Sequence, residues 1–181
     1  MWSSDLTPDL DVFIEESRAD KGKGAGSCMP VVVCASQKGG SGKTTLAGHI
    51  AVEAQRRGAG PVAMIDTDPQ GSLADWWNVR EEEAPLFVKT TIGHLEGDLA
   101  ELREQGISLV VIDTPPAVTG MIQSVIRFAD LVVVPTRPSP HDLRAVGATV
   151  DMVEHAGKAL VFVVNAATPR ARITTDAAIA L

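Results

Sequence analysis

Short apolar runs alternate with longer amphipathic stretches along the chain from about residue 30 onward. The runs are apolar throughout, which is typical of strands that are buried on both faces. The stretches between them repeat apolar residues at three- and four-residue spacing, which predicts helices. The predicted strands are Val31–Ala35, Val62–Ile65, Leu86–Val88, Leu109–Ile112, Leu131–Val134 and Leu160–Val164, and the predicted helices are Lys43–Arg57, Ser72–Arg80, Ile92–Gln105, Thr119–Phe128 and His141–His155.

This alternation predicts an α/β fold, a doubly wound and mostly parallel sheet flanked by helices with right-handed crossovers. In such sheets, ligands bind beyond the carboxyl ends of the strands. Residues 1–29 are expected to form a flexible N-terminal extension, because the glycine- and lysine-rich segment 21–27 is typical of a linker. Residues 30–181 then form one domain, which ends in the beginning of a helix at 173–181.

Composition narrows the class of protein. A length of 181 residues indicates one domain, and the net charge of −7 argues against a uniformly basic nucleic-acid binder without excluding a local basic patch. No apolar run approaches the roughly 18 residues of a membrane helix, and the N-terminus lacks the features of a signal peptide. Cys28 and Cys34 have no metal-binding spacing. We therefore expect a cytoplasmic protein.

The segment between the first predicted strand and the first predicted helix has the composition of a phosphate-binding loop. It reads Lys38-Gly39-Gly40-Ser41-Gly42-Lys43-Thr44-Thr45. Glycines let successive backbone N–H groups turn toward an anion, and the helix adds the positive end of its dipole. Lys43 is then expected to reach the β- and γ-phosphates, and the Thr44 hydroxyl to bind Mg²⁺. The usual first glycine of the motif falls at Gln37, and a second lysine, Lys38, follows it.

Carboxylates follow two other predicted strands. The second strand is followed by Asp66-Thr67-Asp68-Pro69-Gln70, and the fourth by Asp113-Thr114-Pro115. An aspartate at the end of a strand can hold Mg²⁺ directly or through water, and Asp113 is the candidate for that role. Asp66 and Asp68 are two positions apart, so they point the same way on an extended segment. One can then assist the metal shell while the other orients the attacking water.

With these three motifs in order, the chain resembles the ParA family of Walker-type ATPases, within the wider group of MinD-like proteins, over roughly residues 30–180. The loop matches the family's deviant Walker A motif, Asp66–Gln70 its switch segment and Ile112-Asp113 its Walker B motif. The segment Val134–Leu143 is similar to the family's segment after the next strand. The region of Trp76 and Trp77 looks closest to small plasmid-partition ATPases related to ParF.

The resemblance implies a P-loop NTPase fold and a role for each site residue. Lys38 crosses a two-fold dimer interface to the phosphates of the partner's nucleotide, as an arginine finger does in trans. Thr44 and Asp113 hold Mg²⁺ with Asp66 in its outer shell, and Asp68 positions the hydrolytic water. The implied nucleotide-binding residues are Gly39, Gly40, Ser41, Gly42, Lys43, Thr44 and Thr45.

The resemblance therefore implies an enzyme, a Mg²⁺-dependent ATPase that dimerises on ATP and binds nonspecific DNA in that state. A partition-type activator protein stimulates hydrolysis to ADP and phosphate, and repeated cycles partition or position a plasmid, a chromosome or another cargo. A cytoplasmic protein of this kind can also be nucleoid-associated.

Two alternatives remain at the level of sequence. The resemblance implies further C-terminal helices, which this chain is expected to lack, and this leaves open a truncated nucleotide-binding and dimerisation module without efficient hydrolysis. A MinD-like membrane-associated positioning ATPase needs a C-terminal amphipathic helix, and none is visible. Asn165 either contacts adenine, as in family members, or forms a cap or turn. Arg170 and Arg172 are either solvated or part of a DNA-contacting patch.

Overall fold

The computed structural model follows the predicted alternation of strands and helices. It describes residues 29–116 and 119–181, so the predicted N-terminal extension lies outside the described residues except for Met29. The strands are β1 (Val31–Cys34), β2 (Val62–Asp66), β3 (Leu86–Lys89), β4 (Leu109–Asp113), β5 (Leu131–Thr136) and β6 (Ala159–Val164). The helices are α2 (Lys43–Arg56), α3 (Ser72–Asn78), α4 (Leu95–Glu104), α5 (Thr119–Ile126), α6 (Pro140–His155) and α7 (Arg172–Ala180).

The described strands form one parallel sheet in the order β3-β2-β4-β1-β5-β6, which confirms the predicted fold class. The strand order reverses beside β1, because the chain reaches β2 on one side and passes from β4 to β5 on the other. Such a switch point opens a crevice at the carboxyl ends of the strands. Cys34 lies opposite Asp113, and Asp113 lies opposite Asp66, so three strand ends meet at one edge.

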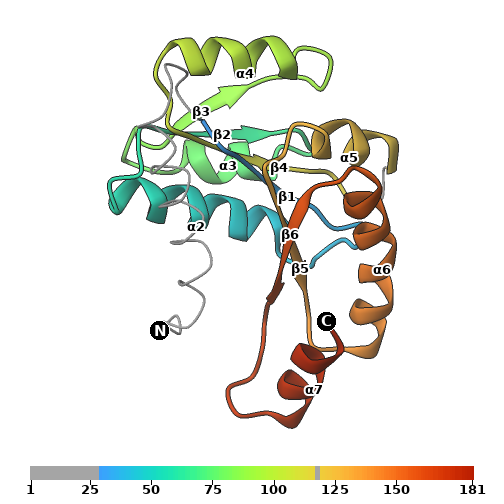
Figure 1. The fold of residues 1–181 in the computed structure, drawn as a ribbon. Helices are drawn as coiled ribbons and strands as arrows, with labels where there is room; N and C mark the ends of the chain where they lie inside the picture. The colour runs from blue at the N-terminus through green and yellow to red at the C-terminus, as the bar shows by residue number, and fades with distance from the viewer. Residues whose placement is uncertain (1–28, 117–118) are drawn as a thin grey trace, which may run out of the picture.

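Helices cover both faces of the sheet (Figure 1). Helices α4, α5 and α6 pack on one face, together with Val33 and Ile112 of the central strands. Helices α2 and α3 pack on the other face, together with Val32 and Val111. Successive side chains of a strand point to opposite faces, so a strand covered on both sides must be apolar at every position. This accounts for the uninterrupted apolar runs of β1 and β4.

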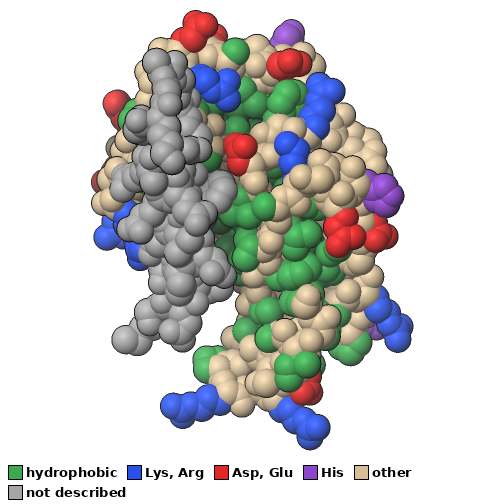
Figure 2. All heavy atoms as spheres, viewed as in Figure 1, with side chains coloured by type: hydrophobic (Ala, Val, Ile, Leu, Met, Phe, Trp, Pro, Cys, Tyr) green, Lys and Arg blue, Asp and Glu red, His purple; other side chains and the backbone are tan. Residues whose placement is uncertain are grey.

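The two edge strands depart from the prediction of burial on both faces. Both end residues of β3 are exposed, and β6 is half-buried along most of its length. Figure 2 shows hydrophobic side chains at the surface in the region of β6. The prediction was wrong here because a strand's place in the sheet order cannot be read from its own apolar run, and an edge strand has a neighbour on one side only.

The helices depart from the prediction only at their ends. Helix α4 begins at Leu95 rather than Ile92, because a turn precedes it in which the His94 N–H donates to the Thr91 carbonyl at 3.0 Å. The helix predicted to begin near Ile173 is confirmed as α7, which contacts β6. Across residues 29–116 and 119–181, no helix is both long and apolar enough to cross a bilayer.

Candidate functional site

Two glycines shape the loop between β1 and α2. Gly40 has a φ of 72° and Gly42 a φ of 104°, in the left-handed region that other residues rarely adopt. A Cβ at Gly42 would also lie 2.0 Å from Nδ2 of Asn165. Helix α2 begins directly after Gly42, which offers its first turn no side-chain cap. The first backbone N–H groups of α2 therefore lie at the carboxyl edge of the sheet, where a helix N-terminus favours an anion.

Asn165 connects the end of β6 to this loop. Its Nδ2 donates to the Ser41 carbonyl at 2.9 Å, and its backbone N–H donates to the Thr136 carbonyl at 2.7 Å. Its Oδ1 accepts from the Ala166 N–H at 2.8 Å. These bonds give Asn165 a structural role in the loop and in the turn after β6. Its contact with adenine stays a prediction.

Lys43 points its side chain into the loop and is buried. Its Nζ donates to the Lys38 carbonyl at 3.4 Å. Burial lowers the pKa of Lys43, while the carboxylates of Asp113 and Asp68 oppose this change. The ammonium group thus lies against the backbone of the glycine-rich loop, where the negative charges of Asp113 and Asp68 favour its protonated form. A charged lysine in a glycine-rich loop can bind a phosphate.

Thr44 and Asp113 form a short hydrogen bond between the loop and the end of β4. The Thr44 hydroxyl donates to Asp113 Oδ2 at 2.6 Å, and the Thr114 N–H donates to Oδ1 at 3.0 Å. Only 1% of Asp113 is exposed. Burial raises the pKa of Asp113 to about 7, assisted by the negative charge of Asp66 and opposed by the hydrogen bond from Thr44 and by Lys43. A buried carboxylate with a raised pKa is electrostatically suited to a cation.

Asp66 and Asp68 have different partners, although the sequence suggested that they point the same way. The strand ends at Asp66, whose Oδ2 accepts from the Leu73 N–H at 3.0 Å and the Ala74 N–H at 3.2 Å. Its Oδ1 accepts from the Asp68 N–H at 2.9 Å. Burial raises the pKa of Asp66, and these hydrogen bonds oppose it. Asp66 therefore fixes the start of α3.

Asp68 lies in the turn that follows β2, half-buried and close enough to Lys43 to stabilise its charge. Its Oδ1 accepts from the Gln70 N–H at 3.0 Å. Between the two aspartates, the Thr67 hydroxyl donates to the Asp113 carbonyl at 2.6 Å. The segment after β2 is therefore hydrogen-bonded to the end of β4. Hydrogen bonds thus connect the segments that carry Asp66, Asp68 and Asp113.

Lys38 forms an ion pair with Asp142 in the first turn of α6, with 2.8 Å between Nζ and Oδ1. The Asp142 N–H donates to Ser139 Oγ at 3.2 Å, and the Ser139 hydroxyl also donates to the Asp142 carboxylate. Burial alone would raise the pKa of Asp142, but the hydrogen bonds from Lys38 and Ser139 outweigh it and lower the pKa.

The sequence reasoning gave no role to Asp142 or Ser139. A local signal for them exists, because Ser139-Pro140-His141-Asp142 has the pattern of a helix start with a serine cap, a first-turn proline and an acidic third position. That pattern predicts the cap and says nothing about Lys38. The fold brings the loop after β1 to the start of α6, and this juxtaposition cannot be read from either segment alone.

Comparison with known proteins gives one family and several relatives. Residues 32–179 match the family described as the CobQ/CobB/MinD/ParA nucleotide binding domain. The chain is 32% identical over 148 residues to the maintenance of carboxysome distribution protein A of Halothiobacillus neapolitanus, covering 77% of this chain and 68% of that protein. The protein of the same name from Gloeobacter kilaueensis is 42% identical over 134 residues, covering 70% and 58%. Protein ParA of Rhizobium radiobacter is 32% identical over 134 residues, covering 73% and 60%.

Solved structures share the fold. Apo McdA from Cyanothece has a TM-score of 0.69 at 19% identity, covering 84% of this chain and 80% of that chain. Cobyrinic acid a,c-diamide synthase from Mycobacterium smegmatis with bound ADP and magnesium has a TM-score of 0.70 at 20% identity, covering 83% and 80%. The MinC:MinD complex of Aquifex aeolicus has a TM-score of 0.64 at 19% identity, covering 77% and 69%. At these identities the likeness concerns the fold.

Proposed function

Because the chain belongs to the CobQ/CobB/MinD/ParA nucleotide-binding family, we propose that it is a Mg²⁺-dependent ATPase that dimerises on ATP and positions DNA or another cargo. The observation that carries the proposal is the 2.6 Å contact between Thr44 and Asp113 beside the buried Lys43. A phosphate-binding lysine, a loop hydroxyl and a strand-end carboxylate are the groups that P-loop ATPases use.

The donor set fits Mg²⁺. A hydroxyl and a carboxylate oxygen that already lie within 2.6 Å of each other are hard oxygen ligands, and Mg²⁺ prefers one or two of these together with substrate phosphates. Within the described ranges there is no group of three or more histidine, cysteine, aspartate or glutamate side chains that could hold a metal. Thr44 and Asp113 would hold the ion together with the nucleotide. When bound, it would neutralise charge on the phosphates.

The remaining roles are those that the family resemblance implies. The amides of residues 39–45 and the ammonium of Lys43 bind the phosphates, and Asp68 orients the attacking water. Asp66 acts mainly by fixing the segment that carries Asp68, since both of its oxygens accept backbone hydrogen bonds. An outer-shell contact with Mg²⁺ is compatible with that position.

Lys38 acts across a two-fold interface on the partner's phosphates. In an isologous dimer each subunit supplies one lysine to the other's site, so nucleotide binding and dimerisation stabilise each other. On its own subunit Lys38 is a half-exposed side chain bound to Asp142, near the surface of the loop. That placement is compatible with transfer to a second subunit.

The relatives' names support the positioning role. Two are named for carboxysome distribution and one is named ParA, so they support a role in positioning a cargo without narrowing the chain to ParF-like members. The chain spans between 58% and 68% of the length of these relatives. A partition-type activator and nonspecific DNA binding in the ATP state are part of the same proposal.

The test measures ATP binding and turnover, with and without Mg²⁺, for the wild type, Lys43→Ala and the control Lys158→Ala. We expect Mg²⁺-dependent turnover in the wild type and the control, and at least about tenfold weaker ATP binding by Lys43→Ala. Equal binding by Lys43→Ala would contradict the assigned site. ATP binding without turnover would contradict the proposed ATPase activity and favour the alternative of a nucleotide-binding module.

The DNA part has its own measurement. Plasmid DNA binding should require ATP and should weaken steeply as salt rises, because phosphate contacts release counterions. Equal binding in ADP and ATP would contradict a nucleotide-controlled switch.

A further inference from the structure

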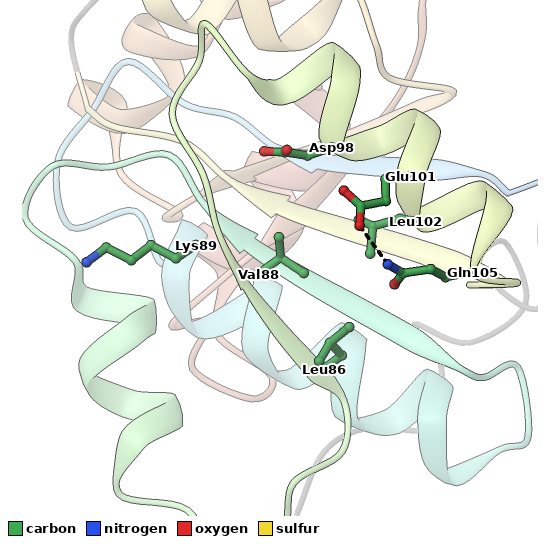
Figure 3. A pocket seen from close by; sticks show the side chains of 7 residues that line it. All are labelled: Leu86, Val88, Lys89, Asp98, Glu101, Leu102 and Gln105. Carbon is green, nitrogen blue, oxygen red and sulfur yellow. Dashed lines mark hydrogen bonds between the residues drawn. The ribbon is translucent and has the colours of Figure 1, made fainter.

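A groove separates β3 from α4 at the edge of the sheet (Figure 3). Strands β2 and β4 lie between β3 and β1, the strand that the phosphate loop follows. Its volume is about 170 Å³. Figure 3 shows side chains of α4 facing those of β3 across it. The lining residues are Leu86, Val88, Lys89, Asp98, Glu101, Leu102 and Gln105.

The floor of the groove is apolar. Leu86 and Val88 point to the same face of β3 as α4, where they meet the buried Leu102. Leu86 is 43% exposed, which makes it one of the most exposed large hydrophobic residues of the described chain. It is nevertheless held in place, because the preceding loop is fixed by hydrogen bonds from Trp77 Nε1 to the Pro85 carbonyl and from Arg80 to the Ala84 carbonyl, both at 3.0 Å.

The rim of the groove is acidic. Asp98 and Glu101 stand on it, and further carboxylates lie on α4 and on the loop before β3. Carboxylates outnumber the cations of this region, so the surface repels nucleic acid and attracts a basic ligand. The carboxylates are Glu81, Glu82, Glu83, Glu96, Asp98, Glu101 and Glu104, and the cations are Arg80, Lys89, Arg103 and Arg127, the last of which pairs with Glu96.

The backbone of β3 adds a second means of recognition. In the described sheet β3 pairs with β2 on one side only, so the N–H and C=O groups of its outer edge are available to another strand. An extended peptide can pair with such an edge and place alternate side chains in the pockets beside it.

We propose that this groove binds an extended, basic segment of a partner protein, which pairs with the outer edge of β3 and packs an apolar side chain on Leu86. Charge complementarity selects this occupant. A second copy of the chain would bring the same acidic surface, and DNA would bring phosphates. Lys89 of β3 lies opposite Asp66 of β2 in the register of the two strands. The added strand would therefore be separated by β3 alone from β2, which leads into the switch segment. The surface is independent of the proposed ATPase site.

The test uses the 181-residue protein without nucleotide and a short fluorescein-labelled peptide of alternating lysine and valine. Fluorescence anisotropy of the peptide measures its binding to the protein. Leu86→Gln and Glu101→Lys should each weaken binding by about tenfold, as loss of an interface anchor does. Val79→Gln and Glu154→Lys are the matched controls, because Val79 is 82% exposed, Glu154 is exposed on α6, and neither residue belongs to the groove or its acidic rim. Both controls should bind like the wild type.

Two further probes complete the test. The same peptide N-methylated at every residue has no backbone N–H left to pair with β3 and should not bind, and the glutamate-for-lysine peptide should not bind either. Equal losses in the controls and the groove variants, or equal binding of the N-methylated peptide, would overturn the proposal. Self-association that Leu86→Gln abolishes would instead assign the groove to a second copy. Because no nucleotide is present, a negative result in this peptide-binding test would leave the proposed ATPase function unaffected. A negative result in the ATPase test would likewise leave the proposed peptide-binding groove unaffected.

Discussion

The ammonium of Lys38 lies 2.8 Å from Oδ1 of Asp142, in an ion pair between the phosphate loop and the first turn of α6. The Asp142 side chain is 8% exposed and that of Lys38 is 37% exposed. Within one subunit, therefore, the lysine already has a carboxylate partner. If Lys38 acts on the phosphates of a second subunit, as proposed, it must exchange that partner, and Asp142 would then compete with dimer formation.

Asp142→Asn should promote dimerisation. The asparagine keeps the shape and the backbone cap to Ser139, but it weakens the hold on Lys38. We expect dimers at about tenfold lower protein concentration in ATP, a change typical of removing one charge-assisted contact. Sedimentation velocity over a concentration series measures this.

Asp151→Asn is the matched control, since Asp151 is exposed on the same helix. It should dimerise like the wild type. A dimerisation threshold that Asp142→Asn raises or leaves unchanged would show that Asp142 does not restrain Lys38.

Alanine substitutions of Asp66 and Asp68 should have different effects, one on stability and the other on ATP turnover. Asp66→Ala removes the acceptor for three backbone N–H groups and should lower the free energy of unfolding by about 2 kcal/mol. The Asp68 carboxylate accepts a backbone hydrogen bond from the Gln70 N–H, so Asp68→Ala should change stability little, yet stop ATP turnover while the ATP dimer persists. Urea unfolding and single-turnover hydrolysis measure the two effects. Rapid turnover by Asp68→Ala would refute its assignment as the water-positioning residue.

Gly42→Ala should damage the loop for two reasons. Its φ of 104° is strained for alanine, and the new Cβ would lie 2.0 Å from Asn165 Nδ2. We expect a loss of about 2 kcal/mol in stability and of ATP binding. Gly39→Ala is the control, because its Cβ would meet nothing within 4 Å. Adding Asn165→Ala to Gly42→Ala should restore part of the loss. If Gly42→Ala and Gly39→Ala are equally stable, the close approach of Asn165 is not tight in solution.

Asp113 should make the nucleotide-free protein less stable as pH rises. Its folded pKa of about 7 lies above the ordinary aspartate pKa of 3.8, so the folded state binds the proton more tightly than the unfolded state does. The stability this provides is complete below about pH 4 and is lost as pH rises toward 7, up to about 4 kcal/mol in total. Asp113→Asn cannot titrate and should lose less stability between pH 5 and pH 8. Chemical denaturation at those two pH values compares them, and parallel losses in both proteins would contradict the raised pKa.

The sequence predicted the strands and the phosphate loop well, because both depend on local residue patterns. The apolar runs located each strand of the described sheet, and Lys43, Thr44 and Asp113 meet as their motifs predicted. What it could not predict depends on contacts between distant segments. Asp142 holds Lys38 and Asn165 holds Ser41 only because β1, β5 and β6 are neighbours. The separate partners of Asp66 and Asp68 follow from a turn after β2 that an extended segment would not contain.

The central claim is that Lys38 completes the site of the other subunit, and mixing two inactive variants tests it most directly. Lys38→Ala keeps Asp68 but lacks the lysine, and Asp68→Ala keeps the lysine but lacks the water-positioning group. If Lys38 acts in trans, a mixed dimer contains one complete site, and an equal mixture should recover about a quarter of wild-type ATP turnover with Mg²⁺ and plasmid DNA. If Lys38 acts within its own subunit, no complete site forms, and the mixture will be as inactive as either variant alone.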